Sequence, residues 1–209
     1  MSNVIRGIAV AAALLAAGCA TLNYKKVKTG EFSGKVQVTW IAPDYFIYDP
    51  APGDPLIFKR ADGKTIEPQR MYTDGGSIPP FLWGIPGYSP WSYAPAYMIH
   101  DWLFEAHHCG IANLDWVTFD DSATILAEAI KTLMEGGEVP RDPEVVDVIY
   151  SGVSSFVAQD LWSNGQCHPP TGPLLAGMAP GAAGPGAPAA PPLPGQGVVV
   201  FTMDLTRHR

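Results

Sequence analysis

The chain has 209 residues and carries 13 lysines and arginines against 20 aspartates and glutamates, which gives a formal net charge of −7. Its basic residues form no cluster beyond Lys25, Lys26 and Lys28, so the composition argues against nucleic acid as a partner. Without the terminal low-complexity segments, about 150 residues remain, which is enough for one domain with its own hydrophobic core.

The first residues have the organisation of a bacterial export signal. Arg6 precedes an apolar stretch, residues 7–17, that is too short to remain as a membrane span. The sequence Leu-Ala-Ala-Gly-Cys ending at Cys19 resembles the lipobox of bacterial lipoproteins. This resemblance implies that residues 1–18 are a signal peptide and that Cys19 is acylated with fatty acids such as palmitate. An ordinary secretory signal with an incidental Cys19 is the alternative.

The lipobox resemblance also implies a location and a partner. Ala20, rather than an aspartate, follows the cysteine. In Gram-negative bacteria this implies a lipid anchor in the outer membrane, with the protein at its periplasmic face. Residues 19–31 are then expected to form a tether. Its lysines either meet anionic headgroups or are simply solvated, and we favour the second interpretation.

The next segment, from Phe32 to Met71, has the patterns of antiparallel strands. Residues 35–40 alternate, residues 45–48 are rich in aromatic side chains, and residues 55–59 end at a turn. Proline and glycine at positions 50–55 separate these strands.

Three helices are predicted to follow the strands. The first runs from about Pro95 to His108, the second from about Leu114 to Glu135, and the third from about Asp142 to Trp162. Strands followed by helices indicate an α+β fold, in one domain over residues 32–168.

The C-terminal part has a different composition. Residues 169–197 consist mainly of proline, glycine and alanine, so we expect a disordered linker. Residues 198–209 form a tail whose apolar part, Val198 to Leu205, either pairs as an edge strand or stays unpaired.

The residues best suited to chemistry lie between Thr73 and Phe104. A turn that contains Asp74, Gly75 and Gly76 precedes a helix with the adjacent pair His100 and Asp101. Histidine titrates near neutral pH, and a glycine-rich turn can present backbone groups to an ion or a substrate. A core histidine and a tight turn held by its own aspartate are the structural alternatives, and both are common.

Two further pairs add to this pattern. Asp120 is expected on the apolar face of the second helix, where a carboxylate needs a partner, and His100 is an obvious one.

Cys109 and Cys167 each follow a helix, and an oxidising compartment would permit a disulfide between them. A disulfide and two free cysteines are about equally compatible with the spacing.

At these residues the chain resembles the bacterial and phage family known as domain of unknown function 1353. Its pattern is T-D-G-x-S-I-P and then a helix with P-A-x-x-x-H-D-x-L-Y/F, which here correspond to residues 73–79 and 95–104. An acid usually follows in the next helix, which here is Asp120 or Asp121. The resemblance covers about residues 32–135 and implies a domain type, without an established activity.

A more distant similarity, to secreted calcium-dependent phospholipases of the A2 type, implies a mechanism. In that pattern His100 would be the base, and Asp120 or Asp121 would orient it. Calcium would be bound by Asp101, by the turn at Asp74, and by carbonyls near Gly75 and Gly76. The substrate would then be a lipid or another envelope ester, and a rim of Trp83, Tyr88, Trp91 and Tyr93 would meet the membrane.

Two alternatives remain open at this point. One is a non-enzymatic envelope or prophage-derived lipoprotein in which the same residues form a structural clasp. The other is a different metal-dependent hydrolase that acts on the cell wall.

Overall fold

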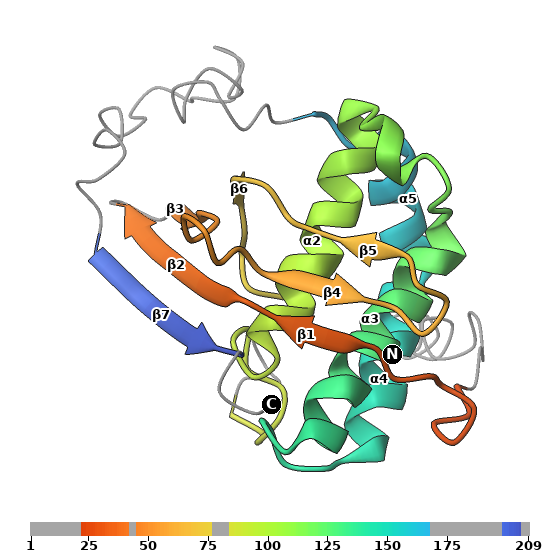
Figure 1. Ribbon diagram of the computed structural model, residues 1–209. Helices are drawn as coiled ribbons and strands as arrows, with labels where there is room; N and C mark the ends of the chain where they lie inside the picture. Colours follow the sequence, from red (N-terminus) through yellow and green to blue (C-terminus); the bar gives the residue numbers. More distant parts are fainter. Residues whose placement is uncertain (1–21, 42–44, 77–83, 168–197, 206–209) are drawn as a thin grey trace, which may run out of the picture.

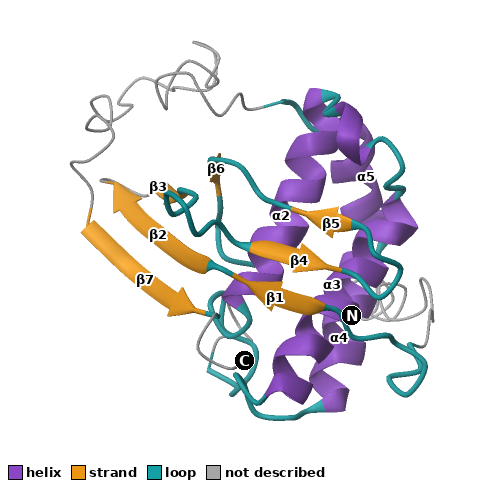
Figure 2. Cartoon of the chain, viewed as in Figure 1, coloured by secondary structure: helices purple, strands orange, loops and turns teal. Residues whose placement is uncertain are grey.

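The computed structural model describes residues 22–41, 45–76, 84–167 and 198–205. The fold is α+β, as predicted: antiparallel sheets form from the first half of the chain, and helices follow. Figures 1 and 2 show the strands on one side of the molecule and the helices on the other. The predicted signal peptide, Cys19 and the predicted linker at residues 169–197 lie outside the described residues.

The strands form two antiparallel sheets. The smaller has the order β1-β4-β5 and the larger the order β6-β3-β2-β7. The bounds are β1 Glu31–Ser33, β2 Lys35–Ile41, β3 Tyr45–Tyr48, β4 Ile57–Lys59, β5 Thr65–Ile66, β6 Met71–Tyr72 and β7 Val198–Asp204. The alternation along β2 places Val36 and Val38 in the core and Gln37 in solvent.

The C-terminal segment returns to the domain as an edge strand. β7 pairs with β2 from Lys35↔Asp204 to Trp40↔Val198, with an irregularity between Val38 and Thr39. The next residue, Leu205, is buried, and its N–H donates to the Gly34 carbonyl at 3.0 Å. Of the two outcomes expected for this tail, the structure therefore shows the paired one.

The helices start and stop at recognisable signals. α2 spans Ala94–Cys109, a short 3₁₀ turn spans Ala112–Leu114, α3 spans Phe119–Gly136, α4 spans Pro143–Val153 and α5 spans Phe156–Asn164. Gly110 and Gly137 end α2 and α3 in the left-handed conformation that glycine adopts without strain. None of the helices in the described part of the chain has the length and hydrophobicity needed to cross a membrane.

The third predicted helix is two helices in the structure. α4 ends at Val153, and the Ser155 side chain accepts from the Ala158 N–H to begin α5. Serine competes for backbone hydrogen bonds and favours caps over helix interiors, so the pair Ser154 and Ser155 breaks the helix.

One core joins the sheets to the helices. Its largest fully buried side chains include Tyr48, Phe58, Ile66, Met98, Leu103, Leu126 and Leu133. A paired charge lies at its border, where Arg60 Nε and Nη2 donate to the two carboxylate oxygens of Glu128 at 2.7 and 3.0 Å. Both side chains are nearly buried, so this bidentate pair fixes the strand region against α3.

The prediction that residues 19–31 form a tether is wrong for most of this segment. The Leu22 N–H donates to Asp147 Oδ1 in α4, and Lys131 in α3 donates to the carbonyls of Tyr24 and Val27. The side chains of Leu22, Tyr24 and Val27 also pack on the core. Residues 22–30 therefore belong to the folded domain, because their backbone groups find partners on the helices.

Candidate functional site

Thr73 connects the larger sheet to α2. Its N–H donates to the Phe46 carbonyl at 3.1 Å, which holds Thr73 directly after β6. Its hydroxyl donates to Asp101 Oδ2 at 2.7 Å and accepts from the Gly75 N–H at 2.9 Å. One buried hydroxyl thus bridges the turn and the helix.

The turn after Thr73 is closely packed. Gly75 has φ of +90°, and a Cβ atom there would lie 2.5 Å from the Pro90 carbonyl oxygen. A Cβ atom on Gly76 would lie 2.9 Å from the ring of Tyr97. Gly75 is therefore required both by its backbone conformation and by the space around it, and Gly76 by the space around it.

Asp101 is held in surroundings that disfavour its charge. Burial raises the pKa of Asp101 well above its ordinary value, and the nearby Asp74 carboxylate raises it further. The Thr73 hydrogen bond acts in the opposite direction. The structure therefore brings together Asp74 and Asp101, two of the predicted metal ligands, and two neighbouring acids are stabilised by sharing a proton or by a cation.

His100 lies on the adjacent stripe of α2. Its ring packs against Phe104 with a centroid separation of 4.9 Å. The Nε2 atom is buried and has no hydrogen-bond partner within the described segments of the chain. Burial lowers the pKa of His100 to about 4, so the imidazole is neutral at pH 7.

The structure does not bring Asp120 or Asp121 to His100. Asp120 is exposed in the first turn of α3, and the Asp121 carboxylate accepts from the Thr118 N–H and hydroxyl in a capping box. No hydrogen bond links either acid to His100. The expectation that Asp120 lies on the apolar face was wrong, because α3 begins at Phe119 rather than near Leu114.

Tyr97 is a site residue that the sequence analysis missed. It lies one helical turn before Asp101, its ring contacts the turn at Gly76, and its hydroxyl is buried without a partner among the described residues. Burial raises the pKa of Tyr97, with Tyr93 and Asp101 adding to the effect. The four-residue spacing from Asp101 was the available signal.

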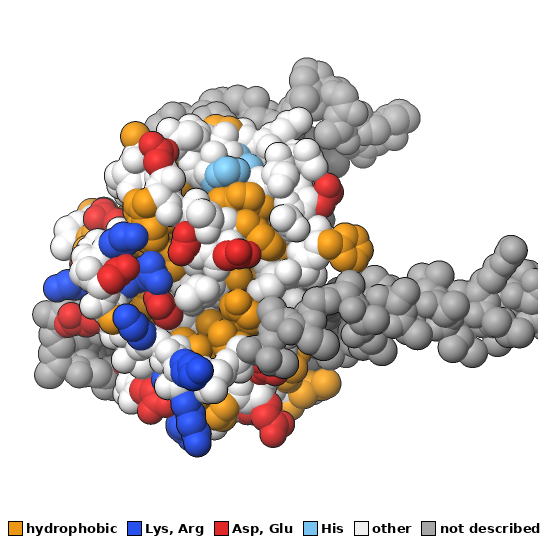
Figure 3. Space-filling model, turned by 90° about the vertical axis from the view of Figure 1, so that its right-hand side faces the viewer, with side chains coloured by type: hydrophobic (Ala, Val, Ile, Leu, Met, Phe, Trp, Pro, Cys, Tyr) orange, Lys and Arg blue, Asp and Glu red, His pale blue; other side chains and the backbone are white. Residues whose placement is uncertain are grey.

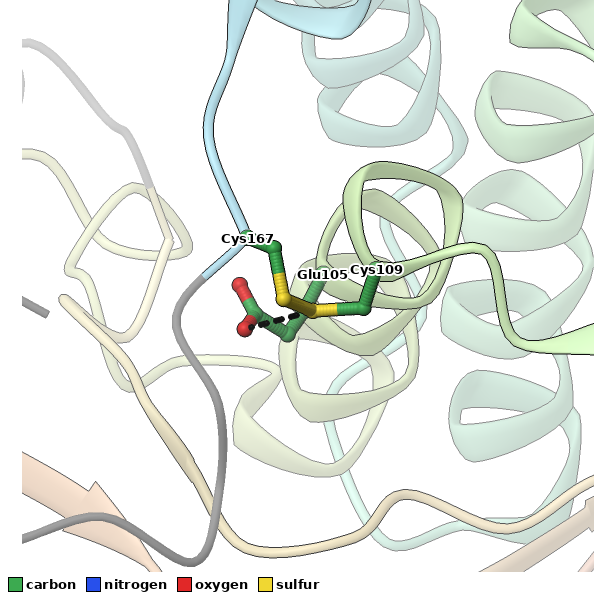
Figure 4. Close-up of side chains that lie close together, drawn as sticks. All are labelled: Glu105, Cys109 and Cys167. Carbon is green, nitrogen blue, oxygen red and sulfur yellow. Dashed lines mark hydrogen bonds between the residues drawn. A yellow bond between two sulfur atoms is a disulfide. The ribbon is translucent and has the colours of Figure 1, made fainter.

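The predicted disulfide between Cys109 and Cys167 is present, with a Cα–Cα distance of 4.7 Å. It joins the end of α2 to the segment after α5 (Figure 4). Glu105 Oε1 lies 3.3 Å from Cys109 Sγ, and because a disulfide sulfur has no hydrogen, this is a contact that becomes a hydrogen bond only after reduction. Glu105 and the two sulfurs are close enough to bind a metal ion, but the disulfide removes both thiolates.

The described residues of the predicted aromatic rim are buried or only partly exposed. Tyr93 is buried, and Trp91 packs between Phe46 and Phe201 at centroid distances of 5.3 and 6.2 Å. Tyr88 is partly buried against the core. Trp83 lies outside the described residues.

Comparison of the chain with protein-family models, with curated proteins and with solved structures found no match. The two family resemblances therefore rest on the sequence alone: the motifs at residues 73–79 and 95–104 and the acid, Asp120 or Asp121, in the next helix.

Replacing Thr73 with valine should lower the free energy of unfolding by about 1–3 kcal/mol, because Asp101 and the Gly75 N–H would both lose a buried partner. Chemical denaturation measures this loss. Thr65→Val, at an exposed position in β5, is the matched control and should change stability by less than about 0.5 kcal/mol. Equal effects of the two substitutions would show that the Thr73 bridge contributes nothing.

Replacing His100 with leucine should reduce the loss of stability at acidic pH. The unfolded chain takes up a proton near pH 6.5 and the folded protein only near pH 4, so the contribution of neutral His100 is complete above 6.5 and is lost as the pH falls toward 4. The difference amounts to at most about 3 kcal/mol. Denaturation at pH 7 and pH 4 tests this, and His107→Leu, at an exposed position on the same helix, should have a smaller effect in the same direction because burial also lowers the pKa of His107. A wild-type stability profile that matches His100→Leu over this range would contradict the buried, neutral assignment.

Proposed function

We propose that the chain is a lipid-anchored protein of the bacterial cell envelope, of the type known as domain of unknown function 1353, with a calcium-assisted ester hydrolase site. One observation carries the hydrolytic part. A neutral histidine, whose buried Nε2 has no partner among the described residues, directly precedes Asp101 on α2, and the charge of Asp101 is disfavoured by burial and by the nearby Asp74 carboxylate.

The donor atoms at the acid pair suit a hard cation. Asp101 and Asp74 offer carboxylate oxygens, and carbonyls of Gly75 and Gly76 are the remaining predicted ligands. Bound calcium would supply stabilisation of negative charge on an ester oxygen. Thr73 fixes the Asp101 carboxylate through its hydroxyl, so the first ligand is oriented before any ion arrives.

His100 would accept a proton from the attacking water. It is neutral at physiological pH and needs no deprotonation before it acts as a base. Its low pKa makes it a weak base, so we expect slow turnover and a rate that does not depend on His100 titration above about pH 5. Since neither Asp120 nor Asp121 contacts it, the histidine would be oriented by its packing against Phe104.

The structural clasp is the second candidate, and the Thr73 bridge favours it. A single hydroxyl satisfies both Asp101 and the Gly75 N–H, which is how a purely structural turn would be fastened to a helix. In that case Asp101 would remain protonated because of its burial and no ion would be needed.

Release of fatty acid from phospholipid vesicles by the full-length protein, with calcium and then with a chelator, distinguishes the two candidates. Hydrolysis predicts release that requires calcium and falls at least about 100-fold in His100→Ala and Asp101→Asn, because each loses one chemical role. Asp120→Asn is the matched control, since its exposed carboxylate has no part in the proposed site. We expect this control to retain full activity.

A folded protein that releases no fatty acid with or without calcium, and whose melting temperature calcium does not raise, would contradict the hydrolase. The clasp would then be the better account. Activity lost in Asp120→Asn as well would contradict the assignment of roles, even if hydrolysis occurred.

A further inference from the structure

The start of the described chain is fixed on the helices. The Leu22 N–H donates to Asp147 Oδ1 in α4 at 3.0 Å, and the Tyr24 hydroxyl donates to Glu135 Oε1 at the end of α3 at 2.9 Å. Lys131 in α3 donates to the backbone carbonyls of Tyr24 and Val27. The chain therefore reaches the domain at one defined place, beside α4.

The cysteine of the lipobox is close to that place in any conformation. Cys19 precedes Leu22 by three residues, and an extended chain spans at most about 3.3–3.6 Å per residue. The Cα atom of Cys19 consequently lies within about 11 Å of Leu22. An acyl group on Cys19 would hold the α4 side of the domain at the bilayer.

α4 and the helix packed next to it, α5, expose hydrophobic side chains. Val148 in α4 is 47% exposed, and Phe156, Val157 and Leu161 in α5 are 60%, 51% and 56% exposed. We call these four residues the α4–α5 hydrophobic surface. Figure 3 shows hydrophobic side chains gathered on the helical side of the molecule, with Lys and Arg toward one edge.

α5 is attached to the domain on one side only. Trp162 is its one buried residue, and it stacks on His107 at a centroid distance of 4.0 Å. His108 Nε2 lies 3.1 Å from the carbonyls of Leu161 and Trp162, so this nitrogen carries the hydrogen and donates to the end of the helix. These contacts leave Phe156, Val157 and Leu161 facing solvent.

We propose that the α4–α5 hydrophobic surface rests on the lipid bilayer, held there by the acyl chains on Cys19. The proposal rests on the lipid anchor of the proposed function and is independent of the hydrolase. Exposed hydrophobic side chains next to a lipid anchor leave water when they enter the headgroup boundary. The acid on α5, Asp160, has a local partner because the Asn164 amide donates to it at 2.8 Å.

Photo-crosslinking of the full-length, lipidated protein in its native membranes tests this proposal. The photoreactive residue p-benzoylphenylalanine replaces Phe156 in one variant and Val198 in another. The two positions are equally exposed, at 60%, and Figure 1 shows α5 and β7 at opposite sides of the molecule. We expect lipid adducts at position 156 to exceed those at 198 by about tenfold, as only α5 would meet the bilayer.

Incorporation of labelled palmitate, with Cys19→Ala as the control, separates the anchor from the surface. Labelled protein with equal lipid adducts at both positions would overturn the proposed surface and leave the anchor standing. Adducts of position 156 with a protein would also overturn it, because the surface would then serve a protein partner. Absence of label from Cys19 would overturn both the anchor and the surface that depends on it.

Discussion

The hydroxyl of Thr73 is the interaction on which the candidate site depends. It joins a carboxylate in the middle of α2 to the backbone of the turn that leaves the larger sheet. Because Gly75 and Gly76 are packed against Pro90 and Tyr97, the turn has little freedom to place that hydroxyl elsewhere. Sheet, turn and helix are thus fixed relative to one another at an acid whose charge is disfavoured by its surroundings.

The position of Asp101, fixed by Thr73, explains why the same contacts are compatible with both candidates, the hydrolase site and the structural clasp. A buried acid beside a second acid gains free energy by keeping a proton or by binding a cation, and the two outcomes compete. His100 differs, since burial alone keeps it neutral. The proposed membrane surface on α4 and α5 involves none of these residues, so the proposed anchor and the proposed chemistry can be tested separately.

The sequence predicted the fold class and α2 well, because alternation and the Pro95 and Gly110 signals act locally. The sequence analysis misplaced the start of α3. Asp121, which it considered as a site residue, instead forms a capping box with Thr118 at the N-terminus of this helix. The sequence analysis also missed the docking of Leu22 on Asp147, since a hydrogen bond from a backbone N–H to a carboxylate 125 positions away leaves no local pattern. The turn, His100 and Asp101 were predicted as a group, but Tyr97 and the bridging role of Thr73 required the three-dimensional arrangement.

The most direct test of the account is an anomalous-difference map from crystals of the protein grown with a lanthanide, which replaces calcium at oxygen-rich sites. The account predicts a peak between the carboxylates of Asp74 and Asp101. A well-ordered Asp101 that keeps its bond to Thr73, with no peak beside it, would contradict the cation site and identify the turn as a structural clasp.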